Sequence, residues 1–368
     1  MPIEIESPEQ FGYANIECNL AESSVTDALY KDLSLRLEDI VLAYGHHVGK
    51  LELRELIVSE CRDLDASDVL LTAGAASSLF IVATSLLDRN DHVMVMHPNY
   101  ATNIETPRAI GCEVDLLELK FEERFHPDIG KLERQLTPST RLLSVTTPHN
   151  PTGMVLTQKE LEGLLAITER ENCFLLVDET YRDLNFGKPP PLAASLSDRV
   201  ISISSLSKAY GLPGIRIGWI VTRNEKLKEL FLAAKEQIFI CNSVVDEEIA
   251  WLFLLKKNRF FPTIREHVER NFTELSSWMN RNPYLEWVKP EGGAVCFPRF
   301  KSSIGVNFDS FYSTLNDHYK TFTGPGHWFG MDRRYMRIGY AWPSTQTLEK
   351  GLGNIMAAAN YATKANKS

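Results

Sequence analysis

The sequence has few cysteines, no excess of positive charge and no long apolar run, and each of these absences excludes a class of protein. Its six cysteines lie far apart with no C-x-x-C pair, which favours free thiols over a disulfide framework or a zinc site. No apolar run approaches the roughly 18 residues that a membrane-spanning helix needs. With 39 Lys+Arg against 48 Asp+Glu, the formal charge of −9 attracts neither nucleic acid nor an anionic lipid surface.

The first ten residues carry acids where a secretory signal carries lysine or arginine. We therefore expect a cytoplasmic protein with no nucleic-acid partner and no membrane association.

The length of 368 residues, at roughly 150 residues per domain, predicts two domains, and 44% hydrophobic residues supply a core for each. No internal repeat, low-complexity tract or Pro/Gly/Ser-rich linker marks the boundary between them. We place the domain boundary instead where the pattern of expected elements changes. We expect an N-terminal arm (1–40) that packs on the small domain, a large domain (41–260) and a small C-terminal domain (261–368).

The large domain alternates short β-rich runs with helical patterns, which predicts an α/β fold. Thr157 and Glu160 form a capping box at the start of a helix expected over residues 157–172. Several of the expected strands are apolar on both faces, as in a mostly parallel seven-stranded sheet covered by helices. These strands cover residues 68–74, 92–98, 112–119, 141–148, 174–181, 200–207 and 215–222.

After Arg223 the pattern changes to long helices. They are expected over residues 224–239, 243–258 and 263–282. A strand-rich segment (284–300) and a last strand and helix after Arg334 follow, so the C-terminal third predicts a smaller α+β domain.

The most informative segment runs from Ser204 to Trp219, SSLSKAYGLPGIRIGW. Lys208 stands at the end of an apolar strand, and the plain interpretation is a solvated loop lysine. The alternative is a desolvated amine whose lowered pKa lets it attack a carbonyl and form a Schiff base. In that case Ser205 and Arg216 are suited to hold a phosphate beside it, the arginine through a bidentate fork.

This segment resembles the lysine segment of the class I/II aminotransferases, the fold-type I enzymes that use pyridoxal 5'-phosphate and include the histidinol-phosphate and aspartate aminotransferases. The match includes the lysine, a serine three positions earlier and an arginine eight positions later. Further segments match in the family's order between residues 44 and 340. The resemblance implies a fold-type I architecture with pyridoxal phosphate bound to Lys208 in the large domain.

Two further strand ends match segments that bind the cofactor ring in this family. Asn150, in PHNPTG, is expected to bond the ring oxygen; outside this context N-P-T-G is only a turn signal. Asp178, in DETY, is a carboxylate at the end of an apolar run, which must be paired or near a cation. The resemblance pairs it with the pyridine nitrogen, and gives Tyr181 a hydrogen bond to the ring oxygen.

Three more segments complete the expected cofactor site. In TAGAASSLF, the N–H groups of Ala75 and Ala76 lie at a helix N-terminus, which suits a phosphate, although small residues there also simply pack helix against strand. The resemblance implies that Tyr100 stacks on the pyridine ring. It also implies that Tyr44 reaches the phosphate of the neighbouring subunit, which predicts a homodimer.

On the substrate side, the resemblance assigns Arg337 to the α-carboxylate, with Asn150 beside it. Glu22 stands in a loop where the family has small residues, and a carboxylate there favours a cationic or polar substrate side chain. The alternative is that Glu22 points to solvent or pairs with a surface lysine. The adjacent His46 and His47 point in different directions with no acid or cysteine to complete a set, so no metal is expected.

These observations predict a pyridoxal-phosphate-dependent aminotransferase that moves an amino group between an amino acid and a 2-oxo acid. Because a fold does not determine a reaction, a C–S lyase, a decarboxylase or an oxidative relative on the same scaffold stays open. A non-catalytic cofactor-binding regulatory protein is the alternative of another class. The sequence does not identify the donor or the acceptor.

Overall fold

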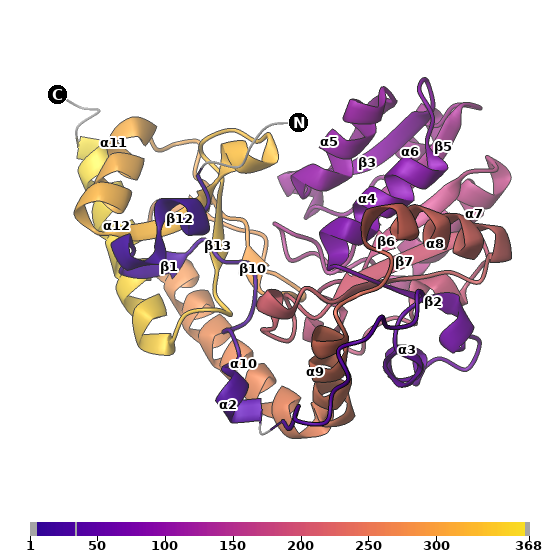
Figure 1. Cartoon of the computed structure of the whole chain (residues 1–368). Coiled ribbons are helices and arrows are strands. Elements are labelled where there is room, and N and C mark those ends of the chain that lie inside the picture. Colours follow the sequence, from indigo (N-terminus) through magenta and orange to yellow (C-terminus); the bar gives the residue numbers. More distant parts are fainter. Residues whose placement is uncertain (1–5, 34, 365–368) are drawn as a thin grey trace.

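The computed structural model describes residues 6–33 and 35–364, and within them a seven-stranded sheet forms the centre of the larger part (Figure 1). Its strand order is β2-β8-β7-β6-β5-β3-β4. All seven predicted strands form and the α/β fold is confirmed. The strands are β2 (Val69–Thr72), β3 (His92–His97), β4 (Glu113–Glu118), β5 (Thr140–Thr146), β6 (Phe174–Asp178), β7 (Val200–Ser205) and β8 (Gly218–Val221).

The sheet is parallel except for β8, which runs antiparallel to its neighbours β2 and β7. Consequently the chain that leaves the end of β7 re-enters the sheet on the same edge, at the start of β8. The C-terminal ends of β2, β5, β6 and β7 also lie on this edge, since these four strands share one direction.

Helices cover both faces of this sheet, as the alternation of its side chains requires. Val93 and Val95 of β3 pack in a cluster with α4 (Ala75–Leu86), α5 (Ala101–Ile110) and α8 (Glu225–Phe239). The intervening Met94 and Met96 pack in a second cluster with α6 (Ile129–Gln135) and α7 (Gln158–Arg170). The predicted capping box begins α7: the Glu160 N–H donates to Thr157 Oγ1 at 3.2 Å, and the Thr157 N–H donates to Glu160 Oε2 at 2.8 Å.

The smaller part contains a four-stranded sheet of order β1-β12-β13-β10 and a two-stranded sheet of β9 and β11. Strand β1 comes from the N-terminal arm and pairs in parallel with β12, so the arm completes a sheet whose other strands lie beyond residue 290. The bounds are β1 (Cys18–Leu20), β9 (Leu285–Glu286), β10 (Val295–Cys296), β11 (Arg299–Phe300), β12 (Thr321–Pro325) and β13 (Met336–Gly339). The domain boundaries stay a prediction, and residues 1–5, 34 and 365–368 lie outside the described chain.

One of the remaining helices begins at a different residue from the one that the sequence predicts. The third long helix, expected from Thr263, begins six residues earlier and runs through Pro262. The proline removes one helical hydrogen bond, but Phe260 and Phe261 in this first stretch pack on Phe253 and Tyr210, which offsets the loss. The helices are α1 (Pro8–Phe11), α2 (Tyr30–Leu33), α3 (Leu51–Val58), α9 (Val244–Leu255), α10 (Lys257–Arg281), α11 (Phe308–Ser313) and α12 (Thr345–Lys364).

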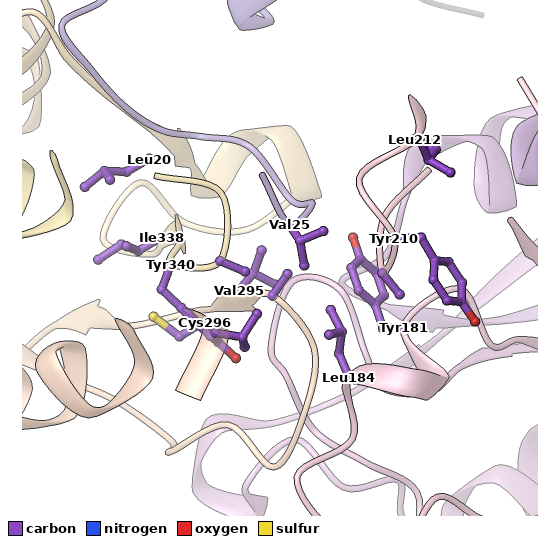
Figure 2. Packing of buried hydrophobic residues seen from close by; sticks show 14 of the residues in the cluster. Leu20, Val25, Tyr181, Leu184, Tyr210, Leu212, Val295, Cys296, Ile338 and Tyr340 are labelled. Atoms are coloured by element: carbon purple, nitrogen blue, oxygen red, sulfur yellow. The ribbon is translucent and has the colours of Figure 1, made fainter. Parts of the chain in front are cut away.

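One hydrophobic cluster joins the arm, the smaller part and the sheet edge (Figure 2). Leu20 and Val25 of the arm belong to the same cluster as Val295 and Tyr340 of the smaller part. Tyr181, which follows β6, is a member from the large sheet. The edge of the large sheet is therefore held against the smaller part by a shared core.

The six cysteines are all free. Across residues 6–33 and 35–364, no helix combines the length and the apolar character needed to cross a bilayer.

Candidate active site

The strand registers bring several predicted site segments to one edge of the large sheet. Thr72 at the end of β2 pairs with Gly218 at the start of β8, and Gly218 pairs with Ser205 at the end of β7. In the next strands, Asp178 at the end of β6 pairs with Thr146 at the end of β5. The segments that leave these strand ends therefore start side by side.

Two glycines allow a helix N-terminus and a guanidinium group to meet at this edge. Gly74 precedes α4 at φ +89°, and a Cβ there would lie 2.5 Å from Arg216 Nη2. A Cβ on Gly218 would lie 2.8 Å from the nitrogen of Ala75. The N–H groups of Ala75 and Ala76 lack helical acceptors at this end of α4, so they and the guanidinium form a group of donors suited to an anion.

Arg216 contacts Ser207, a serine that the sequence analysis did not single out. Its Nη1 donates to Ser207 Oγ at 3.3 Å and to the Pro213 carbonyl at 2.8 Å, and its Nη2 donates to the Ala73 carbonyl at 3.3 Å. The hydroxyl of Ser205 accepts the N–H of Ser207 at 3.3 Å. Both serines therefore stand within this network, and sequence reasoning missed Ser207, although its place directly before Lys208 was a usable signal.

Asp178 is a buried carboxyl group, 8% exposed. The hydroxyl and the N–H of Thr180 donate to its Oδ1 at 2.6 Å and 3.0 Å. Burial raises the pKa of Asp178, against the effect of these two bonds. A cation placed against this carboxyl group would lower its pKa, so the environment suits the carboxyl group to a positively charged partner.

Lys208 is half-buried in the connection from β7 to β8. Burial lowers the pKa of its amine; the negative charge of Glu22 opposes this, and the positive charge of Arg337 reinforces it. A lowered pKa increases the fraction of neutral, nucleophilic amine at a given pH. The N-terminal arm fixes the lysine backbone, because the Val25 N–H donates to the Lys208 carbonyl at 2.9 Å.

Arg337 of β13 links the smaller part to the sheet edge. Its Nη1 donates to Asn150 Oδ1 at 3.1 Å, and its Nη2 donates to the Ala21 carbonyl at 2.7 Å. Its guanidinium carbon lies 5.0 Å from the centre of the Phe329 ring. The structure therefore brings together the two residues assigned to the substrate carboxylate, Arg337 and Asn150.

Tyr181 and Tyr100 differ in their surroundings. The hydroxyl of Tyr181 donates to the Ser23 carbonyl of the arm at 2.7 Å, and burial raises its pKa to about 12. The Tyr181 oxygen therefore keeps its proton at neutral pH. Tyr100 directly precedes α5 and is 43% exposed, with its N–H held by Asn99 Oδ1 at 2.7 Å.

Glu22 is half-buried, and its Oε1 accepts hydrogen bonds from Tyr13 Oη at 3.0 Å and from Asn19 Nδ2 at 3.3 Å. The negative charges of Glu22 and Glu9 both favour a higher pKa of the Lys208 amine. Glu22 is thus held by donors of the arm, within electrostatic reach of the lysine. Tyr13 was not anticipated, because nothing in its local sequence indicates the contact.

Tyr44 is 83% exposed. The neighbouring Val41 and Leu42 are 77% and 80% exposed. Three large apolar or aromatic exposed side chains within four residues are typical of a surface that another chain covers.

Comparisons with known proteins agree with this geometry. The model of the family "Aminotransferase class I and II" matches residues 19–355, so the chain belongs to that family. Capreomycidine synthase of Streptomyces vinaceus is 30% identical over 87% of this chain and 81% of its own length. Aspartate aminotransferase of Pyrococcus horikoshii is 25% identical over 83% of this chain and 80% of its own. The crystal structure of a PLP-dependent aminotransferase from Streptococcus suis superposes with a TM-score of 0.89 at 26% identity, covering 96% of both chains.

Pyridoxal phosphate is the cofactor that membership of this family implies, and the residues at the sheet edge fit it. The donors around Ala75 and Arg216 suit a phosphate. The buried carboxyl group of Asp178 suits a protonated ring nitrogen. The neutral amine favoured at Lys208 suits an aldehyde.

Proposed function

We propose that this enzyme moves an amino group between an amino acid and a 2-oxo acid, with Lys208 as the residue that forms the Schiff base. One observation carries the proposal. The amine of Lys208, the buried carboxyl group of Asp178 and the guanidinium of Arg216 belong to segments next to the adjacent ends of β7, β6 and β8. Burial lowers the pKa of Lys208 and raises the pKa of Asp178. When bound, pyridoxal phosphate supplies an aldehyde and an electron-withdrawing pyridine ring.

In this proposal Lys208 has two roles. Its Nζ would hold the cofactor through the aldehyde carbon as a Schiff base, with loss of water, and the amine, once released by the substrate amine, would take the proton from the substrate Cα. Asp178 keeps a proton at the ring nitrogen. Arg337, beside Asn150, binds the α-carboxylate and so orients the bond that breaks.

The remaining residues hold the cofactor. The N–H groups of Ala75 and Ala76, with Ser205 and Arg216, bind the phosphate. Three aromatic residues complete the proposed site: Tyr100 stacks on the ring, Tyr181 turns its hydroxyl from the Ser23 carbonyl to the ring oxygen, and Tyr44 of a second copy reaches the phosphate. The exposure of Tyr44, Val41 and Leu42 supports the homodimer.

The substrate class follows from charge. We propose that Glu22 selects a donor with a cationic or polar side chain. The negative charges of Glu22 and Glu9 favour a higher pKa of Lys208, so both charges reach the site. A negative charge on the substrate costs several kcal/mol when it is desolvated beside them. Because Tyr13 and Asn19 hold the Glu22 carboxylate, it does not have to reorient to meet the substrate.

A panel of amino acids tests both proposals. Full conversion of the bound cofactor to its pyridoxamine form, with return by a 2-oxo acid, is expected for transamination. Arginine, lysine or ornithine-like donors should react faster than glutamate, and Glu22→Gln should narrow the difference. A wild-type preference for glutamate or aspartate, or an unaltered ranking in the variant, contradicts the role of Glu22.

Other chemistry on this scaffold is the second candidate, because a relative at 30% identity bears the name of a synthase and not of an aminotransferase. The same panel of amino acids distinguishes this second candidate from transamination. Pyruvate and ammonia without the pyridoxamine form indicate a C–S lyase, and release of carbon dioxide indicates a decarboxylase. Binding without turnover of any amino acid indicates a regulatory protein.

A further inference from the structure

A lysine and a glutamate that the proposed reaction does not use are buried beneath the segment that follows Tyr44. Lys235 of α8 is 0% exposed, and Glu247 of α9 is 2% exposed. Burying two ionisable side chains is costly unless each is hydrogen-bonded and compensated. Their contacts identify what they hold.

Both side chains bond the backbone of one short segment, residues 45–50, which we call the Tyr44 loop. Lys235 Nζ donates to the His47 carbonyl at 2.6 Å. Glu247 Oε2 accepts the N–H of Lys50 at 3.2 Å. The pair therefore fixes the loop at two points three residues apart, one from α8 and one from α9.

The backbone between these two points is also tied to its surroundings. The Leu71 N–H of β2 donates to the Val48 carbonyl at 3.0 Å, and Arg54 Nε of α3 donates to the Gly49 carbonyl at 3.0 Å. Gly49 has φ +105°, and a Cβ there would lie 2.4 Å from atoms of Leu71, so the loop backbone packs directly on β2. This end of the loop has one defined position.

The other side of the loop borders a pocket. A pocket of about 450 Å³ is lined by Gly45, His46 and Lys50 of the loop together with Val244 and Glu247. Lys50 Nζ also bonds Glu248 of α9 at 3.2 Å, and His47 bonds Glu236 of α8, so polar contacts from α8 and α9 help to determine where the loop lies.

The two buried charges depend on each other. Burial lowers the pKa of Lys235 to about 8, and Glu247 opposes that change. Burial likewise raises the pKa of Glu247, and Lys235 opposes it. Removing one leaves the other buried without its main compensating charge.

We propose that Lys235 and Glu247 are positioning residues, which hold the Tyr44 loop so that Tyr44 reaches the cofactor phosphate in a second copy of the chain. The inference rests on the proposed function, in which Tyr44 acts in trans. Tyr44 stands three residues before the carbonyl that Lys235 binds, and its side chain is exposed, so the anchored backbone defines where the hydroxyl points. A loop fixed before the partner binds loses less conformational entropy when the contact forms.

The first test compares two lysines of α8. Lys235→Met removes the anchor, whereas Lys228→Met is the matched control, because Lys228 Nζ bonds Asp68 at 3.0 Å and Glu225 at 2.7 Å, outside the loop. We expect Lys235→Met to weaken pyridoxal phosphate binding roughly tenfold, the loss of about one charge-assisted hydrogen bond, and Lys228→Met to leave it unchanged. The near-visible absorbance of the enzyme titrated with cofactor measures the dissociation constant.

Heterodimers separate positioning in trans from a local structural defect. A Lys208→Ala subunit paired with a Lys235→Met subunit has one lysine-bearing site, which receives Tyr44 from an intact loop. Borohydride labelling of Lys208 against cofactor concentration should then match the wild type. A doubly substituted Lys208→Ala/Lys235→Met subunit paired with a wild-type subunit should show the weakened curve. The opposite ranking overturns the proposal.

A milder variant and a separate control make the outcome decisive. Glu247→Gln keeps the side-chain shape and should follow the same ranking, and it replaces Lys235→Met where that variant does not fold. If Tyr44→Phe binds the cofactor as the wild type does, the trans role in the proposed function fails. If Tyr44→Phe is weakened while Lys235→Met and Glu247→Gln bind normally, the positioning role alone is wrong.

Discussion

At the scale of single residues, Asp178 combines a cost in stability with a gain in chemistry. Burial raises its folded-state pKa above the unfolded value, so the free energy of unfolding falls as the pH rises from the unfolded to the folded pKa, and the full cost is present above the folded pKa. We expect Asp178→Asn to raise the melting temperature of the apoprotein at pH 7. The same change should lower kcat by roughly two or more orders of magnitude, because the ring nitrogen loses its proton-holding partner.

Thermal denaturation of the apoprotein and steady-state kinetics of the holoenzyme check this pair of effects. Thr180→Val, which removes one donor to the carboxyl group but leaves the group itself, is the control and should lower kcat far less. Near wild-type turnover of Asp178→Asn would remove Asp178 from the site.

Arg216 should act on cofactor retention and not on the chemical step. Its guanidinium adjoins Gly74 and Ser207 at the start of α4, where a phosphate has several donors. We expect Arg216→Ala to weaken cofactor binding by roughly tenfold or more while kcat at saturating cofactor stays close to the wild type. Equilibrium dialysis with pyridoxal phosphate measures the effect. Arg223→Ala, whose guanidinium bonds the Ser195 carbonyl, is the control, and an equal affinity in both variants contradicts the assignment.

At the scale of elements, local sequence patterns predicted the strands and the helix start that depend on residues close together in the chain. The seven strands of the large sheet and the capping box of α7 follow from apolar runs and from one pair of residues three apart. The contact from Tyr181 to the Ser23 carbonyl joins residues 158 apart, and Glu6 bonds His327 across 321 residues. Such pairs depend on how the arm crosses the completed fold, and no local pattern encodes them.

Family resemblance supplied part of the site for the same reason. Asn150 and Arg337 are 187 residues apart, yet their side chains bond each other. A turn signal and a strand arginine do not predict this pairing, and the resemblance only assigned both residues to the substrate. The pairing of Lys235 with the Tyr44 loop had neither kind of signal and required the structure.

A contact between α7 and the smaller part should make stability depend on pH. His126 Nδ1 lies 2.9 Å from Glu160 Oε1, and its Nε2 lies 3.6 Å from Glu291 Oε2. The hydrogen bond to Glu160 raises the pKa of His126 above the unfolded value, so its contribution is fully present below the unfolded pKa, about 6.5, and is lost as the pH rises through the folded pKa. His126→Gln should therefore lower the melting temperature by roughly 1–3 °C at pH 6 and hardly at all at pH 9.

Thermal melts of the variant and of wild type at the two pH values check this expectation. His318→Gln changes an exposed histidine whose ring meets that of Tyr319 edge-to-face, and it should show no comparable pH dependence. A loss of stability from His126→Gln that is equal at both pH values would mean that packing, and not charge, explains the contact.

At the scale of the whole molecule, the exposed surface around Tyr44 leads to a prediction about assembly. A tyrosine that is 83% exposed, close to the exposed Val41 and Leu42, is available to a second chain, and in a symmetric dimer each copy can complete the other's site. We expect the protein to sediment as a dimer at micromolar concentration and Tyr44→Phe to weaken cofactor binding. Mixing Tyr44→Phe subunits with Lys208→Ala subunits should restore wild-type cofactor affinity at the one lysine-bearing site, because that site then receives its tyrosine from the Lys208→Ala chain. Monomers in the sedimentation experiment, or mixed dimers no better than Tyr44→Phe alone, would confine the site to one chain and leave the exposed segment without this role.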